Sequence, residues 1–169
     1  MKIFPNLAHN QTLRLKGIAD HPNPTLRDPV MYRLKNKPHP RTGSKYVIYP
    51  MYDFTHCISD SLEHIDYSLC SLEFEVRREL YYTFLDLLGL YKPTVWEYSR
   101  LNIEGNVLSK RKIKEFIEKG VVEGWDDPRL LTIRGLKSRG YTPEMLKQFI
   151  DKVNCSRSGN ENVVQYGLL

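Results

Sequence analysis

The chain has 169 residues, of which 41% are hydrophobic and 27% are charged, and its formal net charge is +5. This length suits one domain, or a small domain with an appendage, and the hydrophobic content supports a packed core rather than a disordered chain. No apolar run is long enough to cross a bilayer, and the first residues lack the apolar stretch of a signal peptide. The composition therefore argues against a membrane-spanning class, and we expect no membrane partner.

Cysteine usage and charge distribution narrow the class further. Cys57, Cys70 and Cys155 are odd in number and lack the paired spacing of a metal site, which favours a reducing, intracellular compartment. Residues 1–46 hold nine Lys or Arg and two Asp or Glu, whereas the remainder holds sixteen and eighteen. A basic first quarter predicts a face that meets a polyanion such as RNA or DNA, and solubility alone is the alternative.

The first quarter predicts extended structure interrupted by turns. Residues 13–16 alternate apolar and basic side chains, which is typical of a half-exposed strand, and residues 27–33 resume an extended course. Residues 35–45 combine four basic side chains with two prolines and a glycine. That composition predicts an exposed connector or hairpin tip, at a boundary between two structural units.

From residue 46 onward, predicted strands alternate with predicted helices. Apolar residues at helical spacing indicate helices, with Thr55 as the N-cap of the first and with glycines, Gly89 and Gly120, closing the next two. The predicted order is strand 46–49, helix 55–64, strand 66–71, helix 76–88, strand 94–102 and helix 112–119. Strands separated by helices predict an α/β fold with a parallel sheet and crossover helices.

The last third is predicted to be helical. Residues 132–139 form one expected helix, which Gly140 ends. Thr142 and Pro143 are a suitable cap and first position for a second helix, which is expected to run to about residue 153. Residues 156–162 predict a loop, and residues 163–169 do not complete an element.

Candidate functional residues gather where predicted strands end. Ligands of open α/β sheets bind beyond the carboxyl ends of the strands, which here are followed by residues 49–56, 70–74 and 100–110. Tyr52 and His56 are four residues apart and can share one helix face, although a lone histidine is more often structural. The sequence shows no evident Ser/His/Asp or Cys/His catalytic set and no metal-ligand cluster.

The segment 107–112, Val-Leu-Ser-Lys-Arg-Lys, joins a predicted strand to a predicted helix. Loops of this kind commonly present backbone N–H groups and a cation to a phosphate, and a plain solvated basic loop is the alternative. The other two segments that follow predicted strands, residues 49–56 and 70–74, are expected to form a polar but uncharged pocket. Together they suit a neutral polar ligand beside a phosphate-bearing one.

Seven segments follow one another in a fixed order: residues 26–30, 48–60, 68–74, 96–102, 108–112, 124–129 and 139–142. They resemble the catalytic domain of glutaminyl-tRNA synthetases, a family of class I aminoacyl-tRNA synthetases, over roughly residues 10–153. The segment Leu-Ser-Lys-Arg-Lys resembles this family's variant of the class I lysine-serine signature.

The resemblance implies an ATP-dependent ligase that joins glutamine to tRNA(Gln). The glutamine carboxylate attacks the α-phosphate of ATP, and the aminoacyl group then passes from the adenylate to the terminal ribose of the tRNA. Lys110 is the implied catalytic residue, because a preorganised cation stabilises charge on the phosphates in the transition state. ATP, with Mg²⁺, is the implied cofactor. The implied ATP-binding residues are Arg100, Leu101, Leu108, Ser109, Lys110 and Arg111.

The same resemblance implies that glutamine lies against Tyr52, His56, Cys70 and Phe74. Glutamyl-tRNA synthetase of the archaeal and eukaryotic type is the competing family, and it resembles the chain except for an arginine at the position of Cys70. A buried carboxylate without a cation is costly, so the neutral side chain here favours glutamine. Val76 and Val95 depart from the family's usual residues.

The resemblance also implies how the chain is organised. Residues 1–45 would be the tail of an acceptor-stem-binding insertion, residues 46–122 the second half of a Rossmann-like nucleotide-binding domain, and residues 123–169 a helical connector. The family's His-Ile-Gly-His element and anticodon-binding barrels have no counterpart, so we expect a fragment that is inactive alone. We expect a cytoplasmic monomer. Two non-enzymatic alternatives remain, a non-catalytic tRNA-binding module and a synthetase remnant that serves as a scaffold.

Overall fold

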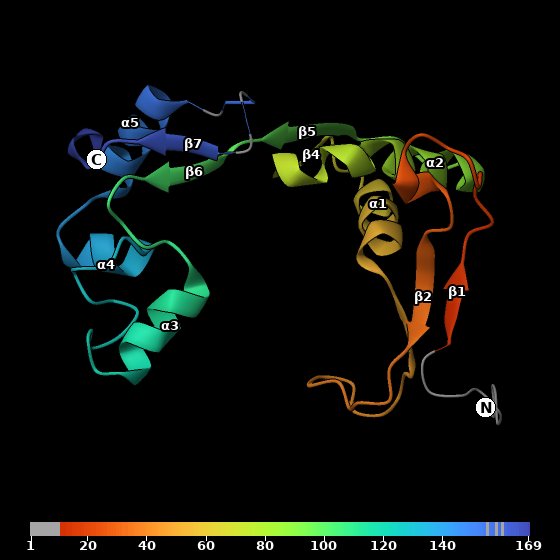
Figure 1. Ribbon diagram of the computed structural model, residues 1–169, viewed down its shortest axis with the longest axis horizontal. Coiled ribbons are helices and arrows are strands. Elements are labelled where there is room, and N and C mark those ends of the chain that lie inside the picture. Colours follow the sequence, from red (N-terminus) through yellow and green to blue (C-terminus); the bar gives the residue numbers. More distant parts are fainter. Residues whose placement is uncertain (1–10, 155, 158, 160) are drawn as a thin grey trace. The chain divides into compact units, whose positions relative to one another are not determined.

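The computed structural model describes residues 11–154, 156, 157, 159 and 161–169. The chain divides into two compact units, residues 1–96 and 97–169, which we call unit 1 and unit 2. Figure 1 shows the elements of unit 1 from red to green and those of unit 2 from green to blue. This division falls inside the segment 46–122, and the domain limits expected from the sequence remain predictions.

None of the helices in the described part of the chain is both long enough and apolar enough to span a bilayer.

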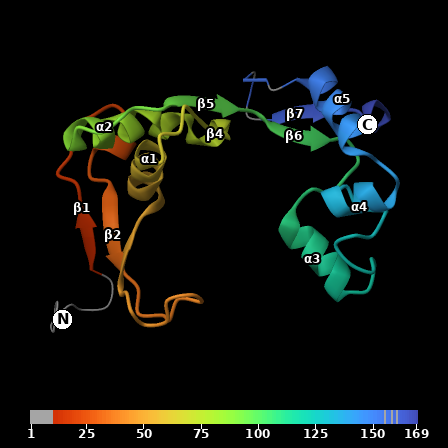
Figure 2. The same ribbon diagram turned by 180° about the vertical axis from the view of Figure 1, so that it is seen from behind.

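Unit 1 begins with an antiparallel sheet of three short strands, β1 (Thr12–Arg14), β2 (Val30–Leu34) and β3 (Ile48–Pro50). Both ribbon views show β1 and β2 side by side (Figures 1 and 2). A short 3-10 helix, Pro24–Leu26, lies between β1 and β2. The predicted hairpin tip at residues 35–45 is confirmed, because it joins two paired strands and carries its own bridge between His39 and Gly43.

The rest of unit 1 packs two helices against each other, α1 (Tyr52–Leu62) and α2 (Arg78–Leu88). Between them come β4 (Tyr67–Ser71) and a 3-10 helix, η2 (Leu72–Arg77), and after them β5 (Thr94–Tyr98), which pairs with β4. The core is apolar and largely aromatic, so hydrophobic burial fixes how the helices lie. Its buried members are Leu26, Phe54, Cys57, Leu80, Tyr81, Phe84 and Leu85.

The start of α1 differs from the prediction. Met51, not Thr55, is the N-cap: its backbone is extended, and its carbonyl accepts hydrogen bonds from the Phe54 and Thr55 N–H groups at 3.1 and 3.0 Å. Thr55 therefore lies within the first turn. Pro50 ends β3, and the helix starts as soon as the chain has passed it, which periodicity alone does not reveal.

The predicted strand 94–102 is two strands in the structure. The break falls at Ser99, whose N–H donates to the Ser156 carbonyl at 2.7 Å and whose hydroxyl donates to the Gly159 carbonyl at 2.5 Å. These bonds take Ser99 out of both ladders, so β5 ends before it and β6 (Arg100–Ile103) begins after it. The strand expected to open the parallel sheet, β3, instead pairs antiparallel with β2, and the described strands form three separate sheets rather than one.

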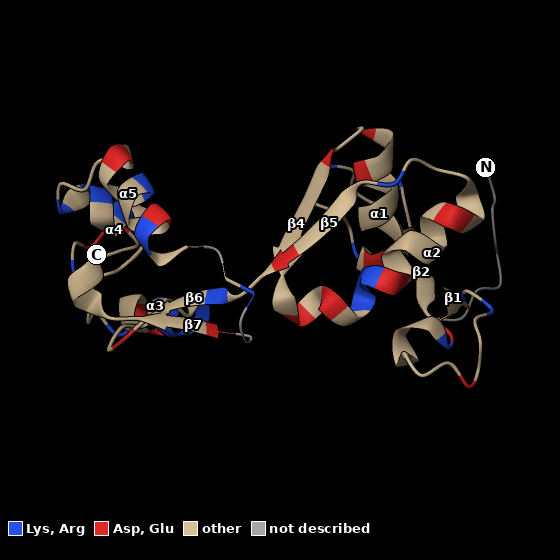
Figure 3. Ribbon diagram, turned by 90° about the horizontal axis from the view of Figure 1, so that it is seen from above, with Lys and Arg blue, Asp and Glu red and all other residues tan. Residues whose placement is uncertain are grey.

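Unit 2 contains the parallel pair of β6 and β7 (Glu161–Val164), in which Arg100 lies opposite Glu161. Figure 3 shows the blue start of β6 beside the red start of β7. Asn102 donates a hydrogen bond to Glu161 at 2.8 Å, and Ile103 packs with Val164 and Phe149. The expectation that residues 163–169 complete no element is therefore wrong. A strand of four residues gives too little alternation to recognise.

The helices of unit 2 follow the predictions closely. They are α3 (Lys110–Glu118), α4 (Ile133–Ser138) and α5 (Pro143–Val153). A last 3-10 helix, η3 (Tyr166–Leu168), was not predicted. The Thr142 side chain caps α5, as predicted, and Thr132 caps α4 by accepting from the Gly135 N–H. Helices and strands in both units confirm the α/β class.

Asp127 organises the segment between α3 and α4. Its carboxylate is almost completely buried and accepts hydrogen bonds from the Glu123 N–H at 2.9 Å and from the backbone and guanidinium of Arg129 at 2.6 to 2.9 Å. These hydrogen bonds lower the pKa of the Asp127 carboxyl well below its usual range. The Arg129 guanidinium has the largest effect, and the backbone N–H groups add to it.

We predict that Asp127→Asn lowers the free energy of unfolding most at neutral pH. A carboxyl whose pKa is lowered on folding stabilises the protein above its unfolded pKa of 3.8, and this stabilisation disappears as pH falls toward the folded pKa. Denaturant unfolding of both proteins at several pH values measures it. A stability difference that stays constant from neutral pH down to the acid limit of folding would contradict this prediction.

We also predict that Gly135→Ala destabilises the chain by about 1–3 kcal/mol, the usual cost of overpacking. A Cβ at Gly135 would overlap the Leu130 carbonyl oxygen and lie 2.7 Å from that of Asp127. Gly167→Ala is the matched control, because nothing lies within 4 Å of its added Cβ. Denaturant unfolding of the two variants checks the prediction, and equal stabilities would contradict it.

Candidate functional site

The aromatic residues predicted to bind the amino acid come together at the start of α1. The Tyr52 and His56 rings stack with centroids 5.0 Å apart, and the Phe74 ring lies 5.5 Å from Tyr52. Tyr52 and Phe74 come from α1 and η2, which bracket β4 in the sequence. Tyr52 is 48% exposed, so one side of this aromatic set remains open to a ligand.

Cys70 lies near the same set. The pKa of the Tyr52 phenol is raised, mainly by partial burial and then by the nearby Cys70, Asp53 and Asp60 side chains. Arg77 lowers it. Cys70 shares a face of β4 with Ser68, whereas Leu69 is 61% exposed on the other face. The structure thus brings the four predicted amino-acid-binding residues together in unit 1.

His56 contacts a hydrogen-bond network that is centred on the carboxylate of Asp60. The Asp60 Oδ2 atom accepts from the Ser68 hydroxyl at 2.6 Å and from the Tyr81 hydroxyl at 3.0 Å, and it lies 3.1 Å from His56 Nε2. Ser68 and Tyr81 are 4% and 6% exposed. Burial, followed by the hydrogen bond to Asp60, raises the pKa of the Tyr81 phenol above its usual range.

Sequence reasoning did not find Ser68, Asp60 and Tyr81. The spacing of four residues between His56 and Asp60 on one helix was the available signal. These residues do include a serine, a histidine and an aspartate, yet their geometry does not suit nucleophilic catalysis. Ser68 donates directly to the carboxylate, and the same histidine nitrogen faces both partners, whereas a triad uses the two opposite nitrogens.

Arg77 is a cation that lies beside the aromatic set. Its guanidinium lies over the Phe74 ring, 5.6 Å from the centroid, and it pairs with Asp53 at 2.5 Å. The carboxylate of Asp53 therefore neutralises the charge of Arg77. With Asp60 also present, the surroundings of Tyr52 are neutral to negative rather than positive.

The six residues predicted to bind ATP lie in unit 2, between the start of β6 and the first turn of α3. The predicted order of strand, loop and helix is confirmed. The loop is anchored at both ends: the Glu104 N–H donates to the Val164 carbonyl at 2.9 Å, and Val107 packs on a cluster that includes Ile113. This anchoring fixes where α3 begins.

The start of α3 is unusually rich in positive charge. Lys110, Arg111 and Lys112 occupy its first turn, which contains no acidic residue, and the Ser109 side chain does not cap it. The first helical hydrogen bond runs from Ile113 to Ser109, so the three preceding N–H groups lie outside the ladder. Among the described residues, none of these three cations forms an ion pair.

This arrangement opposes helix stability, because the N-terminus of a helix is its positive end and favours acidic residues. Exposed cations beside backbone N–H groups that lie outside the helical ladder are instead suited to binding a phosphate. Leu108 is 39% exposed beside them. Arg100 is exposed at the start of β6, whereas the Leu101 side chain packs on the cluster of Ile103.

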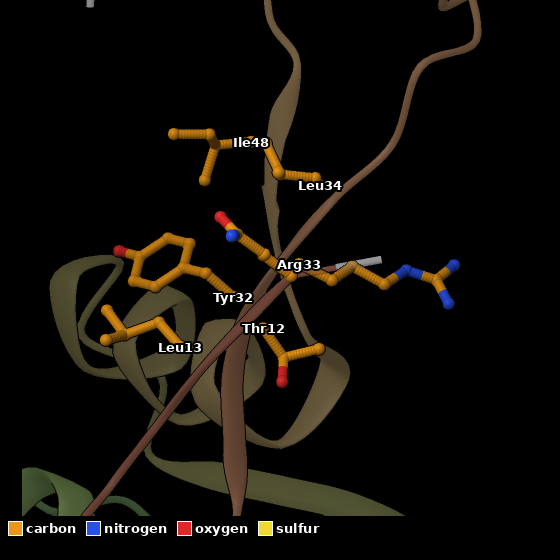
Figure 4. Close-up of a pocket in the computed structure, with 7 residues that line it drawn as sticks. Thr12, Leu13, Tyr32, Arg33, Leu34 and Ile48 are labelled. Atoms are coloured by element: carbon orange, nitrogen blue, oxygen red, sulfur yellow. The ribbon is translucent and has the colours of Figure 1, made fainter. Parts of the chain in front are cut away.

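The described residues contain no group of three His, Cys, Asp or Glu side chains that could hold a metal ion. A separate pocket of about 460 Å³ lies on the sheet of unit 1 and contains none of the predicted site residues. Figure 4 shows Leu13, Tyr32, Leu34 and Ile48 around it, with the Arg33 side chain directed away.

Comparison with known proteins identifies the family. Residues 4–167 match the family of "tRNA synthetases class I (E and Q), catalytic domain". A probable glutamine–tRNA ligase of Dictyostelium discoideum is 50% identical over 157 residues, which are 93% of this chain and 20% of that protein. The glutamine–tRNA ligase of Actinobacillus succinogenes is 48% identical over 159 residues, 93% of this chain and 28% of that protein.

A cytoplasmic glutamine–tRNA ligase of Arabidopsis thaliana is 50% identical over 147 residues, 87% of this chain and 18% of that protein. The chain thus spans between 18% and 28% of the length of these relatives.

Among solved structures, a glutamate tRNA ligase from Elizabethkingia meningosepticum in complex with its amino acid matches with a TM-score of 0.50 and 22% identity. The match covers 95% of this chain and 31% of that one, and it supports the fold alone. Because the family match covers residues 4–167, the chain belongs to the class I tRNA synthetases for glutamate and glutamine, within their catalytic domain.

Proposed function

We propose that this chain is part of a glutaminyl-tRNA synthetase, which attaches glutamine to tRNA(Gln) through a glutaminyl adenylate. In this proposal, residues 46–122 are the second half of the Rossmann-like domain and residues 123–169 a helical connector, while residues 1–45 end an insertion that binds the acceptor stem. The relatives are named as glutamine–tRNA ligases, which supports this choice. The name of the Arabidopsis relative supports a cytoplasmic location, and we propose a monomer.

The charge around Tyr52 is the observation that carries the choice of glutamine over glutamate. Arg77 is paired with Asp53, and Asp60 adds a further negative charge behind His56. A carboxylate entering such a site would lose water without gaining a cation, whereas a neutral amide loses less and can hydrogen-bond. Tyr52 and His56 supply the polar atoms, and Phe74 and Cys70 complete the wall.

The start of α3 is the proposed phosphate site for ATP. Lys110 would stabilise the charge that develops as the carboxylate of glutamine attacks the α-phosphorus and pyrophosphate leaves. Ser109 and Arg111 flank it, and the exposed N–H groups of the first turn add donors. Leu108, Arg100 and Leu101 complete the proposed ATP contacts. Mg²⁺ would arrive bound to the phosphates of ATP, as it commonly does.

We predict that Cys70→Arg, in the enzyme that contains this chain, shifts amino-acid preference toward glutamate. The new guanidinium would face the aromatic set and supply the missing cation. Amino-acid-dependent exchange of pyrophosphate into ATP, compared for glutamine and glutamate, measures the preference.

The matched control is Leu69→Arg, which adds the same charge to the opposite, exposed face of β4. It should leave the preference unchanged. Exchange that depends on neither amino acid in the unmodified enzyme would refute the proposed function, and an unchanged preference in Cys70→Arg would remove Cys70 from the pocket.

We predict that Lys110→Ala lowers kcat for adenylate formation by about 10²–10³-fold, the usual cost of one preorganised charge contact. Lys114→Ala is the control, because Lys114 lies one turn further along α3 and pairs with Glu118 on the surface. Pyrophosphate exchange measured at saturating ATP separates the two variants. Equal turnover in Lys110→Ala and the control would exclude Lys110 from the chemical step.

A further inference from the structure

We propose that Asn102 is a positioning residue that holds the Glu161 carboxylate away from Arg100 and thereby keeps this arginine available to the phosphates of ATP. The inference rests on the proposed function, in which Arg100 contacts ATP. Neither Asn102 nor Glu161 is among the residues that the resemblance assigns to a site. Their roles follow from how β6 and β7 face each other.

Arg100 and Glu161 lie opposite each other where β6 and β7 begin (Figure 3). Side chains two residues apart along a strand share a face of the sheet, and opposed residues of paired strands share it too. Arg100, Asn102 and Glu161 therefore belong to one face. The burial pattern agrees, because Ile103 and Val164 are buried in the core on the other face, whereas Arg100 and Glu161 are exposed.

The charges of this face are not paired as their positions suggest. Opposite charges that face each other across two strands attract, and both side chains are long enough to meet. The Glu161 carboxylate instead accepts a hydrogen bond from the side-chain amide of Asn102 at 2.8 Å. Among the residues that the structure describes, no carboxylate forms an ion pair with Arg100. A neutral donor thus holds the carboxylate that lies opposite this guanidinium.

The backbone at the start of β7 is anchored, so the Glu161 side chain alone decides between these partners. One residue before β6, the Ser99 hydroxyl donates to the Gly159 carbonyl at 2.5 Å. One residue after Glu161, the side chain of Asn162 donates to the Val153 carbonyl at 3.4 Å. A rotation of one side chain therefore suffices to move the carboxylate from an amide to a guanidinium.

A glutamate paired with Arg100 would compete directly with a phosphate. A guanidinium offers the same donors to a carboxylate and to a phosphate, so one partner must leave before the other binds. The apparent affinity for ATP would then fall with the fraction of molecules in which the arginine is free. Asn102 removes this competition without adding a charge, because its amide donates a hydrogen bond but is neutral.

The test is Asn102→Ala, which releases the Glu161 carboxylate, in the enzyme that contains this chain. We expect the KM for ATP to rise about two- to fivefold at low salt, the effect of one competing exposed ion pair, with kcat changed much less. The rise should shrink at high salt, which screens exposed charges. Exchange of pyrophosphate into ATP, measured over a range of ATP concentrations, gives both constants.

Glu161→Ala separates this role from a merely structural one. It loses the same hydrogen bond between β6 and β7 but also removes the competing charge, so the KM for ATP should stay unchanged or fall. Adding Glu161→Ala to Asn102→Ala should restore the original KM. A structural tether requires the opposite, with both single variants impaired alike and no rescue. That pattern, or an unchanged KM in Asn102→Ala, would overturn the proposal.

Asn162→Ala is the matched control. It removes a side-chain hydrogen bond of β7, to the Val153 carbonyl, but releases no carboxylate. Its KM for ATP should therefore equal that of the unmodified enzyme. A rise as large as that in Asn102→Ala would show that any loosening of β7 is sufficient, and it would overturn the proposal.

A measurement on the full chain needs no ATP. In nitrogen NMR of the arginine-labelled chain at low salt, the Arg100 Nε–H, assigned by an Arg100→Lys variant, should exchange rapidly with water. The exchange should slow in Asn102→Ala, because a bound carboxylate shields the guanidinium, and recover when Glu161→Ala is added. Slow exchange in the unmodified chain, or no difference between the variants, would overturn the proposal.

The two measurements also distinguish this inference from the proposed function. An enzyme that activates no glutamine, or one in which Arg100→Ala leaves the KM for ATP unchanged, would refute the proposed contact with ATP. The exchange of the Arg100 Nε–H would still show whether Asn102 keeps Glu161 away from this arginine.

Discussion

The backbone of Met51 connects the sheet of unit 1 to its helices, and the proposed amino-acid site depends on it. Its N–H donates to the Met31 carbonyl of β2 at 2.8 Å, directly after the end of β3, and its carbonyl accepts the first hydrogen bonds of α1. Phe54, three residues later, packs edge-on against both Tyr32 and Phe84. Strand, cap and core together fix the rotation of α1, and that rotation places Tyr52 and His56 on the same open face.

The two candidate sites use charge in opposite ways. Around Tyr52, the cation Arg77 is paired with Asp53 and the Asp60 carboxylate is held by two buried hydroxyl groups, so the site offers neutral rings and defined hydrogen bonds. At the start of α3, three cations have no anionic partner among the described residues and lie at the positive end of a helix, which lowers the stability of that helix. A neutral amino-acid side chain and a polyphosphate require these two different environments.

Much of this could be predicted from the sequence, for identifiable reasons. Thr142 and Gly89 mark helix ends by local chemistry, which needs no knowledge of the fold, and the structure has both as expected. Ser99 broke a predicted strand because its partners lie 57 and 60 residues further along the chain, and no local pattern reveals them. The Asp60 network was missed for the same reason, since Ser68 and Tyr81 reach it only through tertiary packing.

The two cysteines of unit 1 differ in a way that has practical use. Cys57 is fully buried in the core, and burial raises the pKa of its thiol to about 11, so it remains protonated and shielded from reagents. Cys70 is only partly buried and lies beside Tyr52. Of these two thiols, an alkylating fluorophore would therefore react selectively with Cys70, which would place a reporter of ligand occupancy at the wall of the proposed amino-acid site.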